Sequence, residues 1–324
     1  MDFALDETQR EIAGLTAAVL AREPDNAWKA LGQAGLLNLA HPDRLGGDGL
    51  GVIEICAVLT EIGRAGVDTP AFATLALGVL PIAQMGSAEQ QDRLLAEPAV
   101  FTAALAGPVI SDGDRLSGSK KHVGYAEQAR HILVVAGEDV FVVDPADPGV
   151  TLVPTFAASG SPEYTMRLDG VPGEKLGSAA TLQAFAFAGA CALGDGLLAG
   201  ALDLTAQHVR TREQFGRPLA TFQAVAQQIA DVHVAVRTLH LAVWSAVWQL
   251  GVGRDAGRAL DIAAYWLAEE LPTAMHTCHH LHGGIGVDIT YPLHRFYSLG
   301  KDLVRFVGGA EQRLERLGDR CSSI

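Results

Sequence analysis

A histidine-rich segment, HTCHHLHGGIG at residues 276–286, holds the residue types that most suggest chemistry. His276, His279 and His280 have the spacing of one helix face, and histidine is a common metal ligand. No carboxylate or second cysteine completes a recognised zinc-binding spacing. We therefore predict no metal site and interpret the histidines as residues near the negative end of a helix, where they are tolerated.

Two glycines that follow, Gly283 and Gly284, have two interpretations. HGGIG is not the GxGxxG pattern and follows no predicted strand, which disfavours a nicotinamide-nucleotide loop. The glycines either end the helix, as glycine commonly does, or let the backbone approach a ligand closely.

The segment TREQFGRPLATFQ, residues 211–223, separates two long apolar stretches. Phe215 and Gly216 followed by Pro218 predict that one helix stops here and another starts. Taken alone, the segment predicts a corner between two helices, with Arg212 as a solvated charge.

Composition bounds the kind of protein that these elements build. The chain has 324 residues, of which 49% are hydrophobic and only 19% charged, so it can bury a large core in about two or three domains or cover a large subunit interface. Its net charge of -13 repels a phosphate backbone, so we expect no nucleic-acid partner. A small anionic ligand held by one or two local arginines remains compatible with that charge.

The expected compartment follows from what the sequence lacks. We find no apolar run long and clean enough for a membrane span. The amphipathic start MDFALDETQREI is not a secretory signal, so we expect a cytoplasmic protein. The cysteines are scattered without a CxxC pair and predict reduced thiols: Cys56, Cys191, Cys278 and Cys321.

Three regions position these residues, and they predict an α+β fold that is mainly α. Residues 1–98 read as helices, with Asp6 and Ser87 as caps. Residues 99–178 contain short β-branched runs between Gly, Pro and Asp, which predict antiparallel strands of a small sheet or barrel. Residues 179–324 predict four long helices, the third kinked at Pro272 and the fourth spanning residues 292–318.

Together these segments resemble the acyl-CoA dehydrogenase family over nearly the whole chain. The resemblance rests on WKALGQAGLLNLAHPDRLGGDGLG, EIGRAG, ALDLTAQHVRTREQFGRPLATFQAVAQQIADV and LHGGIGVDITYPLHR, in that order. It implies an N-terminal helical domain, a middle β-barrel domain and a C-terminal four-helix bundle. It also implies FAD as cofactor, an acyl-CoA thioester as substrate and an electron-transfer flavoprotein as electron acceptor.

The resemblance assigns six residues to the FAD site: Arg212, Phe215, Gln223, His280, Gly283 and Gly284. The arginine would contact the FAD pyrophosphate of a neighbouring subunit, and its forked donors suit a diphosphate. The phenylalanine would pack near the adenine end, and the glutamine would contact FAD. The paired glycines would let the chain pass close to the cofactor, and the histidine stands where many members carry glutamine.

The sequence departs from the family where catalysis is concerned. GPVISDGDRL replaces the loop that holds flavin and substrate, and KKHVGYAEQ replaces the segment that flanks the flavin ring. The family's catalytic glutamate aligns with Val307, and the alternative base position aligns with Ala186 beside Phe187. We therefore assign no catalytic residue, and a lost general base costs roughly 10²–10⁴-fold in rate.

A known arrangement in this family fits these departures. In some heterotetramers a longer subunit carries the glutamate and most of the flavin site, and a shorter sister completes the FAD site from across the interface. Such pairs act on bulky acyl-CoAs, including steroid side-chain thioesters, and this chain resembles the shorter sister. The alternatives are a self-sufficient homo-oligomer with a displaced base at Asp195, Asp302 or Glu311, and a non-catalytic acyl-CoA-binding or scaffold protein.

Overall fold

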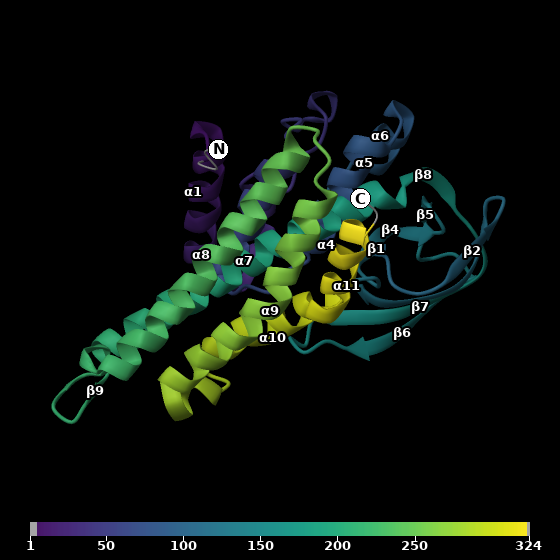
Figure 1. Ribbon diagram of the computed structural model, residues 1–324. Helices are drawn as coiled ribbons and strands as arrows, with labels where there is room; N and C mark the ends of the chain where they lie inside the picture. The colour runs from purple at the N-terminus through teal and green to yellow at the C-terminus, as the bar shows by residue number, and fades with distance from the viewer. Residues whose placement is uncertain (1–4, 323–324) are drawn as a thin grey trace. The chain divides into compact units, whose positions relative to one another are not determined.

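The computed structural model describes residues 5–322, except for the side chain of Cys321 (Figure 1). The chain divides into two compact units built from interleaved segments. The first comprises Met1–Pro24, Cys56–Val67 and Ala190–Ile324, and the second comprises Asp25–Ile55 and Asp68–Gly189. The two boundaries between the three domains expected from the sequence follow changes of secondary structure and stay a prediction.

Long helices make up the first unit. They are α1 (Glu7–Arg22), the second half of α3 (Val52–Ala65), most of α7 (Ala179–Thr211), α8 (Gln223–Gly251), α9 (Gly257–His282), α10 (Leu293–Phe306) and α11 (Gly309–Ser322). Helices α8 and α9 pack side by side, and α10 and α11 both contact α9. Helix α9 continues through Pro272.

Helix α7 is buried along most of its length. By length and composition it is apolar enough to cross a membrane, contrary to our expectation that no run of the sequence is. In its most apolar window 83% of the residues are buried inside the protein, as in the core helix of a bundle.

Two four-stranded sheets dominate the second unit and enclose one hydrophobic core. Their orders are β1-β4-β5-β8 and β2-β3-β7-β6, and all neighbours are antiparallel except β1 and β4. Leu116, Ile132, Val134 and Met166 are among the buried side chains that both sheets contribute. The strands are β1 (Val100–Ala104), β2 (Val109–Asp112), β3 (Arg115–Gly124), β4 (Ala129–Ala136), β5 (Asp139–Val143), β6 (Val150–Phe156), β7 (Pro162–Pro172) and β8 (Glu174–Ser178).

Short helices precede these strands in the chain. They are η1 (Pro24–Asn26), α2 (Ala27–Gln33), η2 (Asp43–Leu45), α4 (Ala71–Thr74), the π-helical turn η3 (Leu75–Val79), α5 (Leu80–Met85) and α6 (Ala88–Leu94). Both predicted caps are confirmed. Asp6 forms a capping box with Gln9 at α1, and Ser87 forms one with Gln90 at α6.

One helix prediction was wrong in detail. The segment 292–318, predicted as one helix, is two helices that break after Val307. Gly308 and Gly309 have φ angles of 91° and 78°, which glycine adopts readily and which end a right-handed helix. The apolar periodicity on both sides of the glycine pair concealed the break.

Candidate functional site

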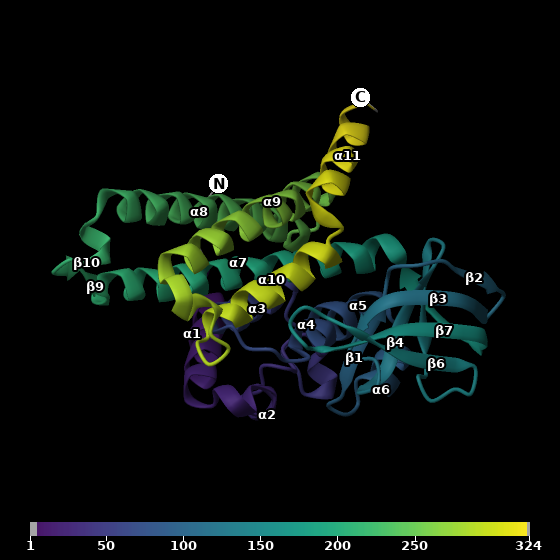
Figure 2. The same cartoon turned by 90° about the horizontal axis from the view of Figure 1, so that it is seen from below.

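A small β-hairpin, rather than a simple helix corner, joins α7 to α8 (Figure 2). Strand β9 (Glu213–Gln214) pairs antiparallel with β10 (Arg217–Pro218), and the turn η4 (Leu219–Thr221) leads into α8. Phe215 and Gly216 form the two-residue turn with φ angles of 53° and 75°, as in a type I′ hairpin. The sequence prediction missed this hairpin because each strand has only two residues.

Phe215 lies at the tip of the hairpin in an unusual state. Its side chain is 92% exposed, and its backbone occupies the left-handed region, which is costly for a bulky residue. Its ring makes an edge contact with Phe222, 6.2 Å between centroids, and the guanidinium of Arg217 lies over the Phe222 ring, 4.1 Å from its centroid. An exposed aromatic side chain held in a strained turn is typical of a binding position.

Arg212 and Gln223 flank this hairpin, and both side chains are exposed. The backbone of Arg212 is fixed, because its N–H donates to the His208 carbonyl at 2.8 Å and its carbonyl accepts from Leu219 at 2.9 Å. Within residues 5–322 no hydrogen bond or ion pair engages its guanidinium. The donors of Arg212 are therefore available to an anion.

The glycine turn ends α9, as one of the two interpretations held. Gly283 has a φ of 63°, and its N–H donates to the carbonyls of His279 and His280. A Cβ atom at Gly283 or Gly284 would meet no atom within 4 Å, so the backbone at the start of the following turn η5 (Gly283–Val287) is open to approach. His280 is exposed on the last turn of α9.

The histidines beside this turn are engaged in packing. The rings of His276 and His279 meet Tyr297 edge-on, at 5.8 Å and 5.1 Å between centroids. His282 Nδ1 donates to the Cys278 carbonyl at 2.8 Å, so its Nε2 accepts from the Tyr291 hydroxyl at 3.1 Å. In the described part of the chain, no group of three His, Cys, Asp or Glu side chains is placed to hold a metal ion.

A stack of two histidine rings joins the end of α7 that leads into the hairpin to the end of α9 that leads into the glycine turn. His208 on α7 stacks on His282 on α9, with 4.3 Å between ring centroids. The hairpin and the glycine turn both lie at this end (Figures 1 and 2). Burial lowers the pKa of His282 and of His208 below the ordinary value, which favours the neutral form of each ring.

Known proteins match both ends of the chain. The N-terminal domain of acyl-CoA dehydrogenases matches residues 2–100, and their C-terminal domain matches residues 180–318. The acyl-CoA dehydrogenase FadE28 of Mycobacterium tuberculosis is 49% identical over 339 aligned residues, which cover 99% of both chains. The chain belongs to the acyl-CoA dehydrogenase family.

Solved structures agree with this assignment over the full length. A chain of the ChsE4-ChsE5 complex from Mycobacterium tuberculosis matches with a TM-score of 0.93 and 31% identity, covering 100% of both chains. A chain of the Tcur3481-Tcur3483 steroid ACAD matches with a TM-score of 0.92 and 35% identity, covering 98% of both. Butyryl-CoA dehydrogenase from Megasphaera elsdenii, at 20% identity and a TM-score of 0.88, shares the fold.

Both positions at which acyl-CoA dehydrogenases are expected to carry a base hold buried aliphatic side chains. Val307 caps the C-terminal end of α10 and is 0% exposed. Ala186 lies inside α7 and is also 0% exposed, and its neighbour Phe187 is buried. Neither Val307 nor Ala186 can accept a proton.

The three candidates for a displaced base have other surroundings. Asp195 is 2% exposed, and its Oδ2 accepts from His240 Nδ1 at 2.9 Å and from Trp244 Nε1 at 3.3 Å. Asp302 forms an ion pair with Arg305 one turn away on α10. Glu311 is exposed in the first turn of α11.

A buried lysine in the β unit escaped the sequence analysis. Lys120 lies on β3 and is 2% exposed, and its Nζ donates to the carbonyls of Leu105 at 3.1 Å and Gly107 at 2.6 Å. Burial lowers its pKa to about 8. Two residues that follow it, His122 and Tyr125, have positive φ angles of 59° and 55°. This is the KKHVGYAEQ segment that departs from the family, and only the repeated charge of KK marked it in the sequence.

Proposed function

We propose that this chain is the subunit without the catalytic base in a heteromeric, FAD-dependent acyl-CoA dehydrogenase. The observation that carries the proposal is the pair of buried aliphatic side chains, Val307 and Ala186, at the two base positions. The chain nevertheless keeps an exposed surface suited to a cofactor at the hairpin and glycine turn. A subunit that contributes binding groups but no base is useful only beside one that supplies the base.

The residues at the hairpin end fit the diphosphate and adenine parts of FAD. Arg212 offers a forked set of donors without a protein partner among the described residues, and such a fork matches phosphate oxygens. Phe215 offers an exposed ring, and the open backbone at Gly283 and Gly284 lets a ligand approach. When bound, FAD supplies the hydride-accepting chemistry.

The role of this chain would be to bind and orient. Arg212 would hold negative charge, the Phe215 ring would cover the adenine, and Gln223 and His280 would offer hydrogen bonds. The α-proton of the substrate would pass to a carboxylate of the longer partner. The fixed backbone of Arg212, bonded at both its N–H and its carbonyl, would keep the guanidinium in place.

Likeness to two named complexes supports the partner and the substrate class. One relative is a chain of the ChsE4-ChsE5 complex, and another belongs to a steroid ACAD of two named components. By extension from these relatives, we propose that this chain assembles with a longer sister subunit and that the complex acts on a bulky, steroid-like acyl-CoA substrate. An electron-transfer flavoprotein as acceptor and a cytoplasmic location complete the proposal.

Flavin content tests the proposal through Arg212. The chain would be co-expressed with the longer acyl-CoA dehydrogenase of the same genome, and FAD would be counted from the visible spectrum of the purified complex. Arg212→Ala should weaken FAD binding by about 10- to 100-fold, the worth of a charge-assisted hydrogen bond. Arg210→Ala, on the last turn of α7, is the matched control and should bind FAD normally. Equal FAD affinity in the two variants would contradict the proposal.

A further inference from the structure

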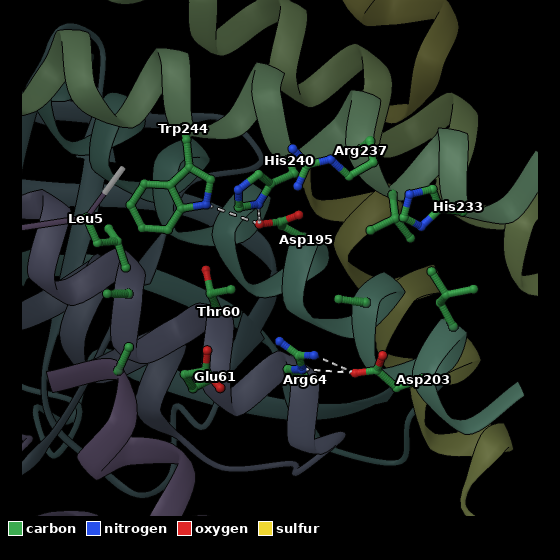
Figure 3. A pocket seen from close by; sticks show the side chains of 15 residues that line it. Leu5, Thr60, Glu61, Arg64, Asp195, Asp203, His233, Arg237, His240 and Trp244 are labelled. Atoms are coloured by element: carbon green, nitrogen blue, oxygen red, sulfur yellow. Dashed lines mark hydrogen bonds and ion pairs between the residues drawn. The ribbon is translucent and has the colours of Figure 1, made fainter. Parts of the chain in front are cut away.

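A cavity lies within the helical unit, apart from the hairpin and the glycine turn. It has a volume of 460 Å³ and is lined by α1, α3, α7, α8 and Leu5 (Figure 3). Alanine, leucine and valine side chains and the indole of Trp244 form its apolar walls. Its polar groups come from two sides: acids from α3 and α7, and histidines and an arginine from α8.

Close contact between α3 and α7 fixes the acidic side. A Cβ atom at Gly196 would lie 1.9 Å from the Thr60 carbonyl oxygen, and one at Gly200 would lie 2.2 Å from that of Arg64. Only glycine permits this approach of two helix backbones. Glu61 on α3 and Asp195 on α7 are therefore presented to the cavity from a rigid crossing.

Two of the cavity's carboxylates have protein partners. Arg64 Nε and Nη2 both donate to Asp203 Oδ2, at 3.1 Å and 2.6 Å. His240 Nδ1 and Trp244 Nε1 both donate to Asp195 Oδ2. In each case a single carboxylate oxygen receives both donors, as the dashed lines of Figure 3 show.

Two acceptors facing the cavity lack a donor within residues 5–322. They are the Oδ1 atom of Asp195, a residue only 2% exposed, and the carboxylate of half-buried Glu61. A desolvated carboxylate oxygen without a donor is costly. Burial raises the pKa of Glu61 despite the nearby Arg64, with Asp195 and Asp203 adding to the rise. A ligand with several hydrogen-bond donors would satisfy both acceptors.

We propose that this cavity binds a small organic ammonium ion, with its positive group at Glu61 and Asp195 and its hydrocarbon part against the apolar walls. Three carboxylates and two guanidinium groups line the cavity, and these five groups together carry one negative charge. An ammonium group has three donors for the free acceptors. This binding site goes beyond the proposed dehydrogenase role and does not depend on it.

Arg237 sets the orientation of such a ligand. It is a cationic side chain of the α8 wall, and it lies beside His240 in Figure 3. It repels a second positive charge, so an amine with one ammonium group fits better than a diamine.

Isothermal titration of the full-length chain with n-hexylamine near neutral pH tests the proposal. Saturable binding should weaken about tenfold or more in Glu61→Gln, which removes a charged acceptor but keeps the side-chain shape. Glu269→Gln, an exposed change on α9, is the control and should bind like the parent chain. Affinity should also fall as the pH is lowered and Glu61 takes up a proton.

Other outcomes would overturn it. These are no saturable binding of n-hexylamine, equal affinity in Glu61→Gln and Glu269→Gln, or equal binding of hexanoate, which would mark an anion or a purely apolar site. Asp195→Asn provides a second variant, expected to weaken n-hexylamine binding as well. Circular dichroism establishes that each variant is folded, and Glu61→Gln alone decides the question if Asp195→Asn does not fold.

Discussion

A buried charge cluster that fastens α11 to α9 yields the sharpest stability prediction. Asp261 of α9 is 2% exposed and lies among three arginines of α11. Its oxygens are 3.4 Å from Arg313 Nη1, 3.6 Å from Arg316 Nε and 2.8 Å from Arg320 Nε. Helix α11 begins just after Val307, so this cluster also holds the segment where the family resemblance predicts a base.

Replacing Asp261 by Asn should be severely destabilising, because it leaves three guanidinium groups without their shared anion. Arg313 has a side chain only 4% exposed, and burial already lowers its pKa. Removing one partner of such a buried pair costs about 3–5 kcal/mol. That is a large part of the roughly 5–15 kcal/mol that holds a typical domain folded.

Urea unfolding followed by circular dichroism measures this loss. Asp92→Asn is the matched control, since Asp92 pairs with Arg44 at 2.7 Å while both side chains are about half exposed. An exposed pair of this kind contributes about 0–1 kcal/mol. The double variant Asp261→Leu/Arg313→Met should recover part of the loss. If Asp261→Asn cost no more than Asp92→Asn, the cluster would not anchor α11 and the reasoning would fail.

Three further predictions concern pH, assembly and thiol reactivity. Burial lowers the pKa of several histidines, so below about pH 6.5 these side chains bind more protons in the unfolded chain than in the folded chain. The free energy of unfolding should therefore fall as the pH drops from about 6.5, by at most about 1.4 kcal/mol per pH unit for each proton. A free energy of unfolding that does not change between pH 7 and about pH 5 would contradict this. These histidines are His41, His131, His208, His279 and His282. Phe215→Ala should leave the melting temperature of the isolated chain almost unchanged, because the ring is 92% exposed. The same variant should weaken FAD binding by the complex. A lower melting temperature would show that the ring has a structural role instead. In a Cys321→Ser variant the three remaining thiols should react with a disulfide reagent only when the chain unfolds, because all three are buried. Burial also raises the pKa of Cys191 to about 12. Rapid labelling of the folded chain would refute this prediction.

Local patterns in the sequence predicted the local structure well. The caps at Asp6 and Ser87 and the end of α9 at Gly283 follow from a few neighbouring residues, and the structure has all three. The family resemblance supplied the fold class, which full-length matches confirm.

Features that depend on distant contacts or on competing local signals were missed. Asp195 meets His240 across 45 residues of sequence, and Asp261 meets Arg320 across 59. No periodicity encodes such pairs. The break at Gly308 was hidden because the apolar pattern continues on both sides of it, and the hairpin at Phe215 because it is too short to show alternation.

The central claim, that this chain completes a flavin site but cannot perform the chemistry alone, has one direct test. Acyl-CoA-dependent bleaching of the flavin would be measured without oxygen for the isolated chain, with added FAD, and for its complex with the longer sister subunit. We expect no bleaching in the isolated chain, because Val307 and Ala186 offer no base, and rapid bleaching in the complex. Bleaching by the isolated chain at a rate comparable to that of the complex would contradict the account.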